Sequence, residues 1–186
     1  MTKKDKKRSP QALLKLAAKG DKQAYGAFYE EYFGEIYRYI YFRVSSHHEA
    51  EDLTEIVFLK AWETLHQKGK EIQNFRAWIY RIAHNIVIDH HRTKKHEVSL
   101  DHISPAAKPE SGPEKLIEIK QENQKLMDGI AQLEPKYREV IVLRFINQLS
   151  HAETAKVLNI KEGHVRVLQY RGLKILSDLM TEDRKK

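Results

Sequence analysis

The sequence predicts an all-α protein of two small helical domains joined by a flexible linker, the C-terminal domain being a helix-turn-helix. Three observations lead to this fold class. Apolar residues recur at intervals of three and four over most of the chain, which is the period of a helix that buries one face. Prolines, glycine and serines, which discourage regular structure, gather between Glu97 and Pro113. Finally, residues Ser150 to Leu176 form two helical patterns separated by a short turn.

Four helices are expected in the first domain, residues 9–96, and the later three begin at residues that favour a helix start. Asp21 is expected to cap a long helix, because its side chain can accept hydrogen bonds from free backbone N–H groups. Ser46 with Glu49 predicts a capping box for the next helix, and Asn74 is expected to cap the last. Most tyrosines and both tryptophans fall on the apolar faces of these helices, so they are expected to form the core.

The linker, residues 97–113, differs from both domains in charge as well as in composition. From Glu97 to Glu122 there are six acidic residues and three basic ones, although the chain as a whole is basic. The second domain is expected over residues 114–180. It starts with a helical pattern that runs to Glu134, and Pro135 suits the first turn of the following helix.

The helix-turn-helix is predicted from its boundaries. Ser150 and Glu153 have the spacing of a capping box and so predict the start of a short helix. Asn159 can adopt the left-handed conformation that ends a helix. The second helix would then continue an apolar stripe toward the shared core, through Val165, Leu168, Leu173 and Leu176.

The opposite face of this second helix carries polar and basic side chains. Four basic residues stand there with one acidic residue, Glu162. Arg and Gln can donate hydrogen bonds to base edges and Lys neutralises phosphates, so the face suits the major groove of DNA. The alternative is a packing element whose basic face is only solvated. The candidate DNA-contacting residues are Lys161, His164, Arg166, Gln169, Tyr170, Arg171 and Lys174.

A second basic helix lies in the first domain, between Arg76 and His96. Five basic residues there accompany the single acidic residue Asp89, and Arg81, Asn85, Asp89 and Arg92 fall on one side. The loop before it contains Gly69 and two lysines. Such a loop beside a basic helix could hold an unstacked base. The alternative is a solvated helix face with a loose loop.

Composition narrows the classes of function. The formal net charge is +7 and the pI about 9.4, which favours a polyanionic partner. The absence of cysteine excludes disulfides and cysteine-ligated zinc. The ten histidines show none of the spacings of metal ligands, and no P-loop, nucleophile elbow or dinucleotide fingerprint occurs, so we expect no metal, no cofactor and no enzyme activity. The chain has neither a membrane-span pattern nor a signal-peptide pattern, which predicts a cytoplasmic protein.

Three segments of the chain, taken in their order along the sequence, resemble a known family. They are AEDLTEIVFLKAWETL (residues 50–65), NFRAWIYRIAHNIVIDHHR (74–92) and the C-terminal stretch that begins LEPKYREVIVLRF (133–145) and includes the helix-turn-helix. Together they are similar to bacterial extracytoplasmic-function (ECF) sigma factors of RNA polymerase. The resemblance covers Asp21 to Leu176 except for the linker.

The resemblance implies an alternative sigma factor, which would bind core RNA polymerase and direct it to promoters without any small-molecule substrate. The partners would be core polymerase, promoter DNA (duplex and melted non-template strand) and an anti-sigma factor. The helix that reads minus-thirty-five DNA would be the one with Lys161 to Lys174, and the acidic linker would run toward the active-site cleft. Polymerase would contact Asp52, Leu53, Glu55, Ile56 and Phe58. The minus-ten element would be recognised and opened by Lys68, Lys70, Asn74, Arg76, Arg81, Asn85, Asp89 and Arg92.

The chain departs from the family pattern at three places. Glu55-Ile56 stands where a Gln-Glu or Gln-Asp pair is common, which brings an apolar group to the polymerase face. Lys161 occupies the cap position that is usually Ser, and Lys cannot accept N–H bonds. His164 replaces the usual Thr, which is expected to alter minus-thirty-five specificity. Two other functions stay open: a free-standing dimeric helix-turn-helix regulator, and an interaction module that mimics a sigma factor and binds its inhibitor.

Overall fold

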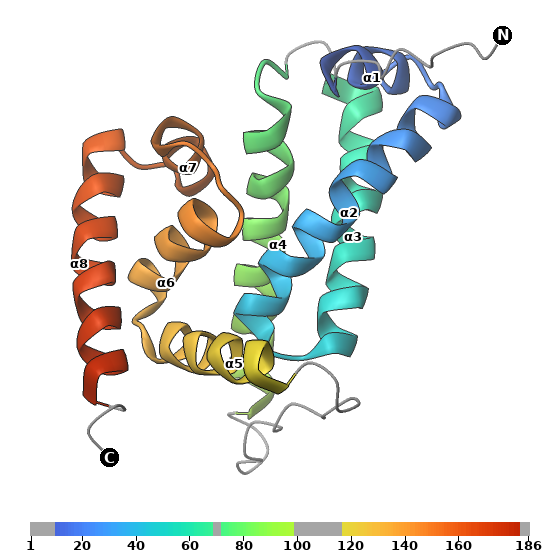
Figure 1. Cartoon of the computed structure of the whole chain (residues 1–186). Helices are drawn as coiled ribbons and strands as arrows, with labels where there is room; N and C mark the ends of the chain where they lie inside the picture. The colour runs from blue at the N-terminus through green and yellow to red at the C-terminus, as the bar shows by residue number, and fades with distance from the viewer. Residues whose placement is uncertain (1–9, 69–71, 99–116, 183–186) are drawn as a thin grey trace, which may run out of the picture.

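The computed structural model describes residues 10–68, 72–98 and 117–182, and these residues form helices without any strand (Figure 1). The all-α prediction is confirmed. The first group of helices is α1 (Pro10–Ala17), α2 (Lys22–Val44), α3 (His47–Lys68) and α4 (Phe75–Val98). The second group is α5 (Ile117–Gln132), α6 (Pro135–Ile141), the π-helical turn η2 (Val142–Ile146), α7 (His151–Leu158) and α8 (Glu162–Glu182).

The caps predicted for α2, α4 and α7 are present. Asp21 Oδ1 accepts hydrogen bonds from the backbone N–H groups of residues 23 and 24, at 3.0 and 3.1 Å. Asn74 Oδ1 accepts from Ala77 N at 2.9 Å. Ser150 and Glu153 form both bonds of the capping box, and Asn159 ends α7 with a φ of 55°. Local side-chain chemistry therefore sets where these helices begin and end.

The α1–α4 group encloses an aromatic core. Phe28 on α2 lies 4.3 Å from Phe75 and 5.9 Å from Phe58, measured between ring centroids. Tyr39 and Tyr80 are fully buried, at edge-to-face geometry. Such pairs add to the stabilisation that burial alone gives. The prediction that the aromatic residues mostly form core is confirmed for these rings.

The α5–α8 group is built around α6 and η2, where residues 140–143 are buried. The π-helical turn was not predicted. It ends with Asn147 N donating to Val142 O at 3.0 Å and Leu149 N donating to Leu143 O at 2.9 Å. The additional residue in this turn changes the direction of the side chains that follow. It thereby places Asn147 against the first group of helices.

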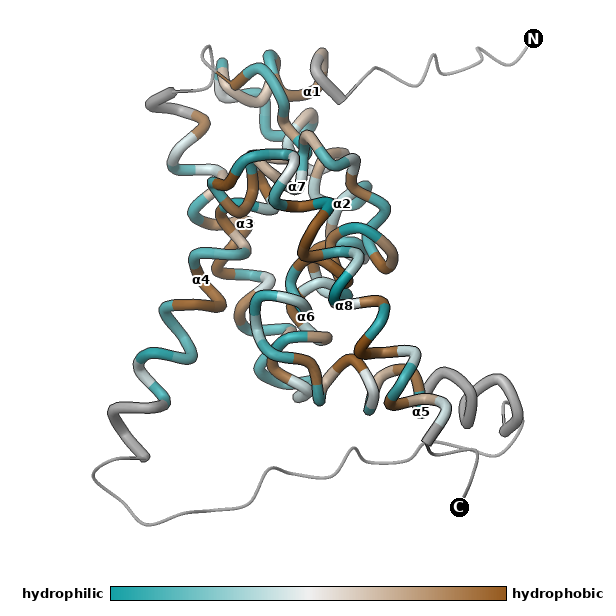
Figure 2. Tube along the Cα trace, turned by 90° about the vertical axis from the view of Figure 1, so that its left-hand side faces the viewer, coloured by the Kyte–Doolittle hydropathy of each residue, from teal (hydrophilic) through white to brown (hydrophobic). Residues whose placement is uncertain are grey.

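The two groups of helices pack directly on each other. α7 packs against α4 (Figure 1), and both η2 and α5 contact α2. Figure 2, in which the second group lies in front of the first, shows hydrophobic segments gathered toward the middle of the molecule. The sequence predicted two domains but not this contact. The predicted linker falls largely on residues 99–116, which lie outside the described residues. Within the described ranges, none of the helices combines the length and the apolar content that crossing a membrane requires.

Candidate nucleic-acid interface

The polar face predicted for the second helix of the helix-turn-helix is exposed on α8. Val165 and Leu168 are buried against the neighbouring helices, whereas six of the seven candidate residues are exposed and Gln169 is half-buried. Leu173 was expected in the buried stripe, but it is 39% exposed. The reason is its neighbour Gly172, whose missing side chain lets α8 approach α6 so closely that an added Cβ would lie 3.3 Å from Tyr137.

At the start of α8, which Lys161 was expected to weaken, hydrogen bonds are made by the backbone. His164 N and Val165 N donate to Lys161 O at 2.9 and 3.2 Å. Arg166 pairs with Glu162 one turn earlier, at 2.5 Å between Nη2 and Oε1. Exposed pairs of this kind contribute little to stability. The Arg166 guanidinium can therefore exchange Glu162 for a phosphate or a base at little cost.

The corresponding face of α4 is exposed along its length. Arg81, Asn85, Asp89 and Arg92 all lie on the surface, and Arg92 Nη2 pairs with Asp89 Oδ1 at 3.1 Å. The structure thus gathers four of the eight predicted minus-ten residues on one side. Lys70 lies outside the described residues, and only the backbone of Lys68 is described.

A pocket opens where the end of α3 meets the start of α4. Its volume is about 370 Å³, and it combines the flat ring of Trp78 with polar groups. Its lining includes Thr64, Asn74 and Arg81, together with Lys156 of α7. A flat ring next to hydrogen-bonding groups is the arrangement that accommodates an unstacked base. The sequence indicated the loop and α4 here but not the contribution of Lys156.

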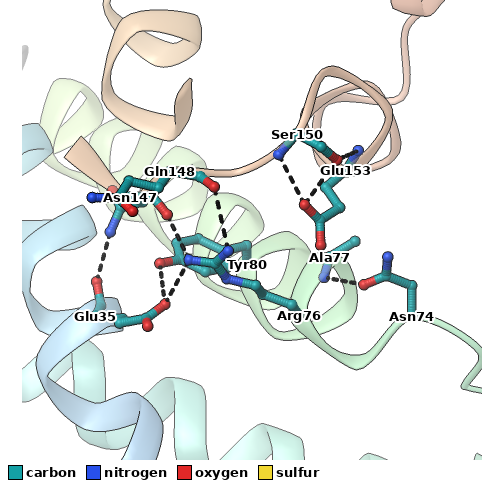
Figure 3. Close-up of polar contacts among 9 residues, drawn as sticks. All are labelled: Glu35, Asn74, Arg76, Ala77, Tyr80, Asn147, Gln148, Ser150 and Glu153. Carbon is teal, nitrogen blue, oxygen red and sulfur yellow. Dashed lines mark hydrogen bonds and ion pairs between the residues drawn. The ribbon is translucent and has the colours of Figure 1, made fainter. Parts of the chain in front are cut away.

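Arg76 faces the second group of helices instead of the α4 surface (Figure 3). Its Nη2 donates to Asn147 O at 2.6 Å and to Glu35 Oε2 at 3.1 Å, and its Nη1 donates to Gln148 O at 3.3 Å. Asn147 Nδ2 in turn donates to Glu35 O at 3.0 Å. One of the predicted DNA contacts is therefore engaged at the junction between the two helical groups.

A second polar cluster at the junction is buried. The carboxylate of Glu139 on α6 pairs with Arg43, accepts from the hydroxyl of Tyr39, and lies 3.0 Å from His84 Nδ1. Arg43 and Tyr39 belong to α2 and His84 to α4, so one carboxylate joins three helices. We call these four residues, Tyr39, Arg43, His84 and Glu139, the junction cluster. Sequence reasoning missed it; the available signal was a glutamate directly before the apolar run VIVL (residues 140–143).

The protonation state of His84 follows from its surroundings. Burial, together with the guanidinium groups of Arg43 and Arg81, lowers the pKa of His84 to about 4. His84 is therefore neutral near pH 7. Because a carboxylate only accepts, His84 Nδ1 carries the proton and donates to Glu139. Among the described residues, no group of three or more His, Asp or Glu side chains is arranged to hold a metal ion.

The predicted polymerase-contacting residues divide between surface and core. Asp52, Glu55 and Ile56 are exposed on α3, with Asp52 paired to His48 at 2.8 Å. Leu53 and Phe58 are only 7% and 3% exposed and pack in the core, so in this arrangement they support the face without forming it. Leu59, which the sequence analysis did not single out, is 60% exposed beside Ile56 at 41%. Ile56 and Leu59 thus place two apolar side chains on the exposed face of α3.

In comparisons with known proteins, each of the two helical groups matches a protein family. The family described as Sigma-70 region 2 matches residues 28–97, and the family described as Sigma-70, region 4 matches residues 123–176. The ECF RNA polymerase sigma factor BldN of Streptomyces coelicolor is 36% identical over 173 residues, which are 92% of this chain and 66% of BldN. The chain therefore spans about two thirds of that relative.

Two further proteins with the name sigma factor are similar to this chain. The ECF RNA polymerase sigma factor SigW of Bacillus subtilis is 31% identical over 88% of this chain and 92% of SigW. The sigma factor RpoE of Bartonella quintana, solved in complex with the anti-sigma factor NepR, has the same fold. Its TM-score is 0.69 at 22% identity, over 88% of this chain and 98% of that one.

Proposed function

This chain belongs to the family of ECF RNA polymerase sigma factors, and we propose that it binds core RNA polymerase and directs it to specific promoters. The observation that carries the proposal is the presence of two exposed basic helix faces, on α4 and α8, within regions that match the family in order. Two DNA-reading faces in one chain suit a protein that recognises two separate promoter elements.

The α8 face is suited to the minus-thirty-five element as duplex DNA. Its arginines and Gln169 can donate to base edges in the major groove, while its lysines neutralise phosphates. An α-helix fits that groove by width, and α8 rests on α6 and α7 as the second helix of a helix-turn-helix does.

The α4 face and the adjoining pocket are suited to the minus-ten element after it opens. Taking one base out of the stack costs a few kcal/mol. Stacking on Trp78 and hydrogen bonds from Asn74 or Arg81 can return about 1–3 kcal/mol for that base. Asn85 and Arg92 would hold the flanking strand. No bond is made or broken by these residues; in this proposal the polymerase carries out nucleotidyl transfer, in the cytoplasm.

Part of the proposed minus-ten site lies against the second group of helices. Lys156 of α7 stands at the pocket, and Arg76 is bonded to Asn147 and Gln148. The exposed α4 face is accessible in the packed arrangement, but the two helical groups have to separate before Arg76 can reach DNA. The exposed residues Ile56 and Leu59 offer polymerase a docking surface that is accessible while the groups are still packed. An anti-sigma factor is the further proposed partner, by analogy with the complex of RpoE.

Run-off transcription tests the proposal. Core polymerase is assayed with and without this protein on a library of genomic fragments. Initiation at discrete sites that share two sequence elements is the expected result. A stable complex with polymerase that adds no initiation would instead indicate a decoy. Failure to bind polymerase, together with a footprint of the free protein on a palindrome, would indicate a self-sufficient regulator.

A further inference from the structure

Arg144 connects α8, the second helix of the helix-turn-helix, to the turn that precedes α7. It lies on η2, and its Nε donates to Gln169 Oε1 of α8 at 3.1 Å. Its Nη1 donates to the carbonyl oxygen of Leu149. One guanidinium is thus held by the backbone at one end and holds a candidate base-reading side chain at the other.

This contact determines which end of the Gln169 amide points away from Arg144. A guanidinium has five N–H donors and no acceptor, so only the amide oxygen of Gln169 can face it. The Nε2 group, with its two donors, then lies on the far side of the amide. The orientation follows from hydrogen-bonding chemistry and does not depend on how oxygen and nitrogen are told apart in the coordinates.

The fixed orientation changes the base that Gln169 recognises. A freely rotating Gln pairs with adenine by donating to N7 and accepting from N6, which needs both ends of the amide at the base. Because the oxygen is turned toward Arg144, the end of the Gln169 amide that is left to face a base is Nε2 with its two donors. Guanine offers two acceptors, N7 and O6, whereas adenine places its own N6 donor beside N7.

We infer that Arg144 is a positioning residue that makes Gln169 a donor-only reader, so that one base pair of the minus-thirty-five element is selected as guanine over adenine. The inference rests on the proposed function, because it assumes that α8 enters the major groove. It adds a specific role to Arg144, which sets the preference through Gln169 without touching the base itself.

The test uses the full-length protein with core polymerase and a promoter library randomised across the minus-thirty-five element. The wild-type protein is expected to favour guanine over adenine about tenfold at one position, the size of one good base contact. Gln169→Ala should abolish the preference at that position alone. Arg144→Met, which keeps an unbranched apolar side chain but removes the guanidinium donors, should reduce the same preference and leave the other positions unchanged.

Arg138→Met is the matched control. Arg138 also lies on this helical segment and donates to backbone carbonyls, at 3.2 Å to Ile130 O and 3.1 Å to Leu133 O, but it has no bond to α8. It should leave base preference intact. Arg144→Met in the Gln169→Ala background should have no further effect on base preference, and the salt dependence of binding should not change, since a lost phosphate contact would lower its slope by about one.

Three results would overturn the inference. They are an unchanged guanine preference in Arg144→Met, a change in preference that persists without Gln169, and a lowered salt slope. The second would mean that Arg144 reads a base directly, and the third that it contacts a phosphate. Failure of the proposed function looks different, because the wild-type protein would then select no promoter from the library at all.

Discussion

Replacing Glu139 by Gln tests whether the junction cluster holds the two helical groups together. The carboxylate is 7% exposed, and its partner Arg43 is 8% exposed. Gln keeps the size and one acceptor oxygen but removes the charge. The Arg43 guanidinium would then remain buried opposite a neutral group, while Tyr39 and His84 would compete for a single oxygen.

The expected cost follows from burial. Removing one partner of a buried ion pair destabilises by about 3–5 kcal/mol, because the remaining charge keeps its desolvation penalty without its attraction. Replacing both partners, as in Arg43→Met with Glu139→Met, is expected to cost far less, since no charge is left buried. The double mutant should therefore be more stable than Glu139→Gln although it lacks more hydrogen bonds.

The chain contains no cysteine, which allows a direct measurement of domain separation. Glu63→Cys on α3 and Ser177→Cys on α8 are both at exposed positions and can carry a donor and an acceptor dye. Glu139→Gln is expected to lower energy transfer between them while circular dichroism keeps its helical signal. Glu134→Gln is the matched control, because that carboxylate is 63% exposed and its pair with Lys136 contributes little.

Two results would refute this reasoning. If Glu139→Gln left both energy transfer and the free energy of unfolding at wild-type values, the cluster would not hold the junction. If the double mutant were less stable than Glu139→Gln, packing and hydrogen bonds would outweigh the buried charge.

Three further predictions concern the protonation of His84, two glycines and Asn85. The pKa of His84 is about 4 in the folded protein and has its ordinary value near 6.5 in the unfolded chain, so the unfolded state takes up the proton first as the pH falls. The free energy of unfolding is therefore expected to decrease as the pH drops from about 6.5 to about 4. Urea unfolding should show a smaller decrease in His84→Asn. Gly34→Ala on α2, where an added Cβ meets nothing within 4 Å, should raise the free energy of unfolding by about 0.5–1 kcal/mol. Gly172→Val should lower it by about 1–3 kcal/mol, because the site is already closely packed. The melting temperatures of the two variants should therefore shift in opposite directions. Asn85→Ala should impair transcription from a duplex promoter more than from one with a pre-opened minus-ten element; equal effects on both templates, or none, would contradict a role in opening.

Much of the fold could be predicted because the decisive signals are local. Asp21, Asn74 and the Ser150–Glu153 capping box act within four residues of themselves, so a helix start is readable from sequence. The exposed faces of α4 and α8 follow from helical periodicity in the same way. Periodicity is less informative where a helix is covered on several sides. Phe58 was proposed as a surface contact but is buried, whereas Leu59 next to it is exposed.

The junction could not be predicted, because its contacts join residues that are far apart in sequence. Tyr39 and Glu139 are 100 positions apart, and Arg76 and Asn147 are 71 apart. Nothing in the sequence near Glu139 says which helices surround it. A glutamate directly before an apolar run indicates only that, where it is buried, a partner must exist, since an unpaired buried charge is too costly. The π-helical turn adds a second obstacle, because it shifts the register of the side chains after it.

The size of the packed chain gives an independent reason why this junction has to open for the proposed function. By their names, the two promoter elements lie about 25 base pairs apart, which is about 85 Å along duplex DNA. A compact chain of 186 residues has a radius of gyration of about 16 Å, and so a diameter near 40 Å. The α4 and α8 faces therefore cannot reach both elements of straight DNA while they are packed together. A junction that contains charged groups suits such a change. When Arg43 and Glu139 separate, both regain their hydration, which offsets part of their lost attraction, whereas an apolar contact of the same area would recover nothing from water.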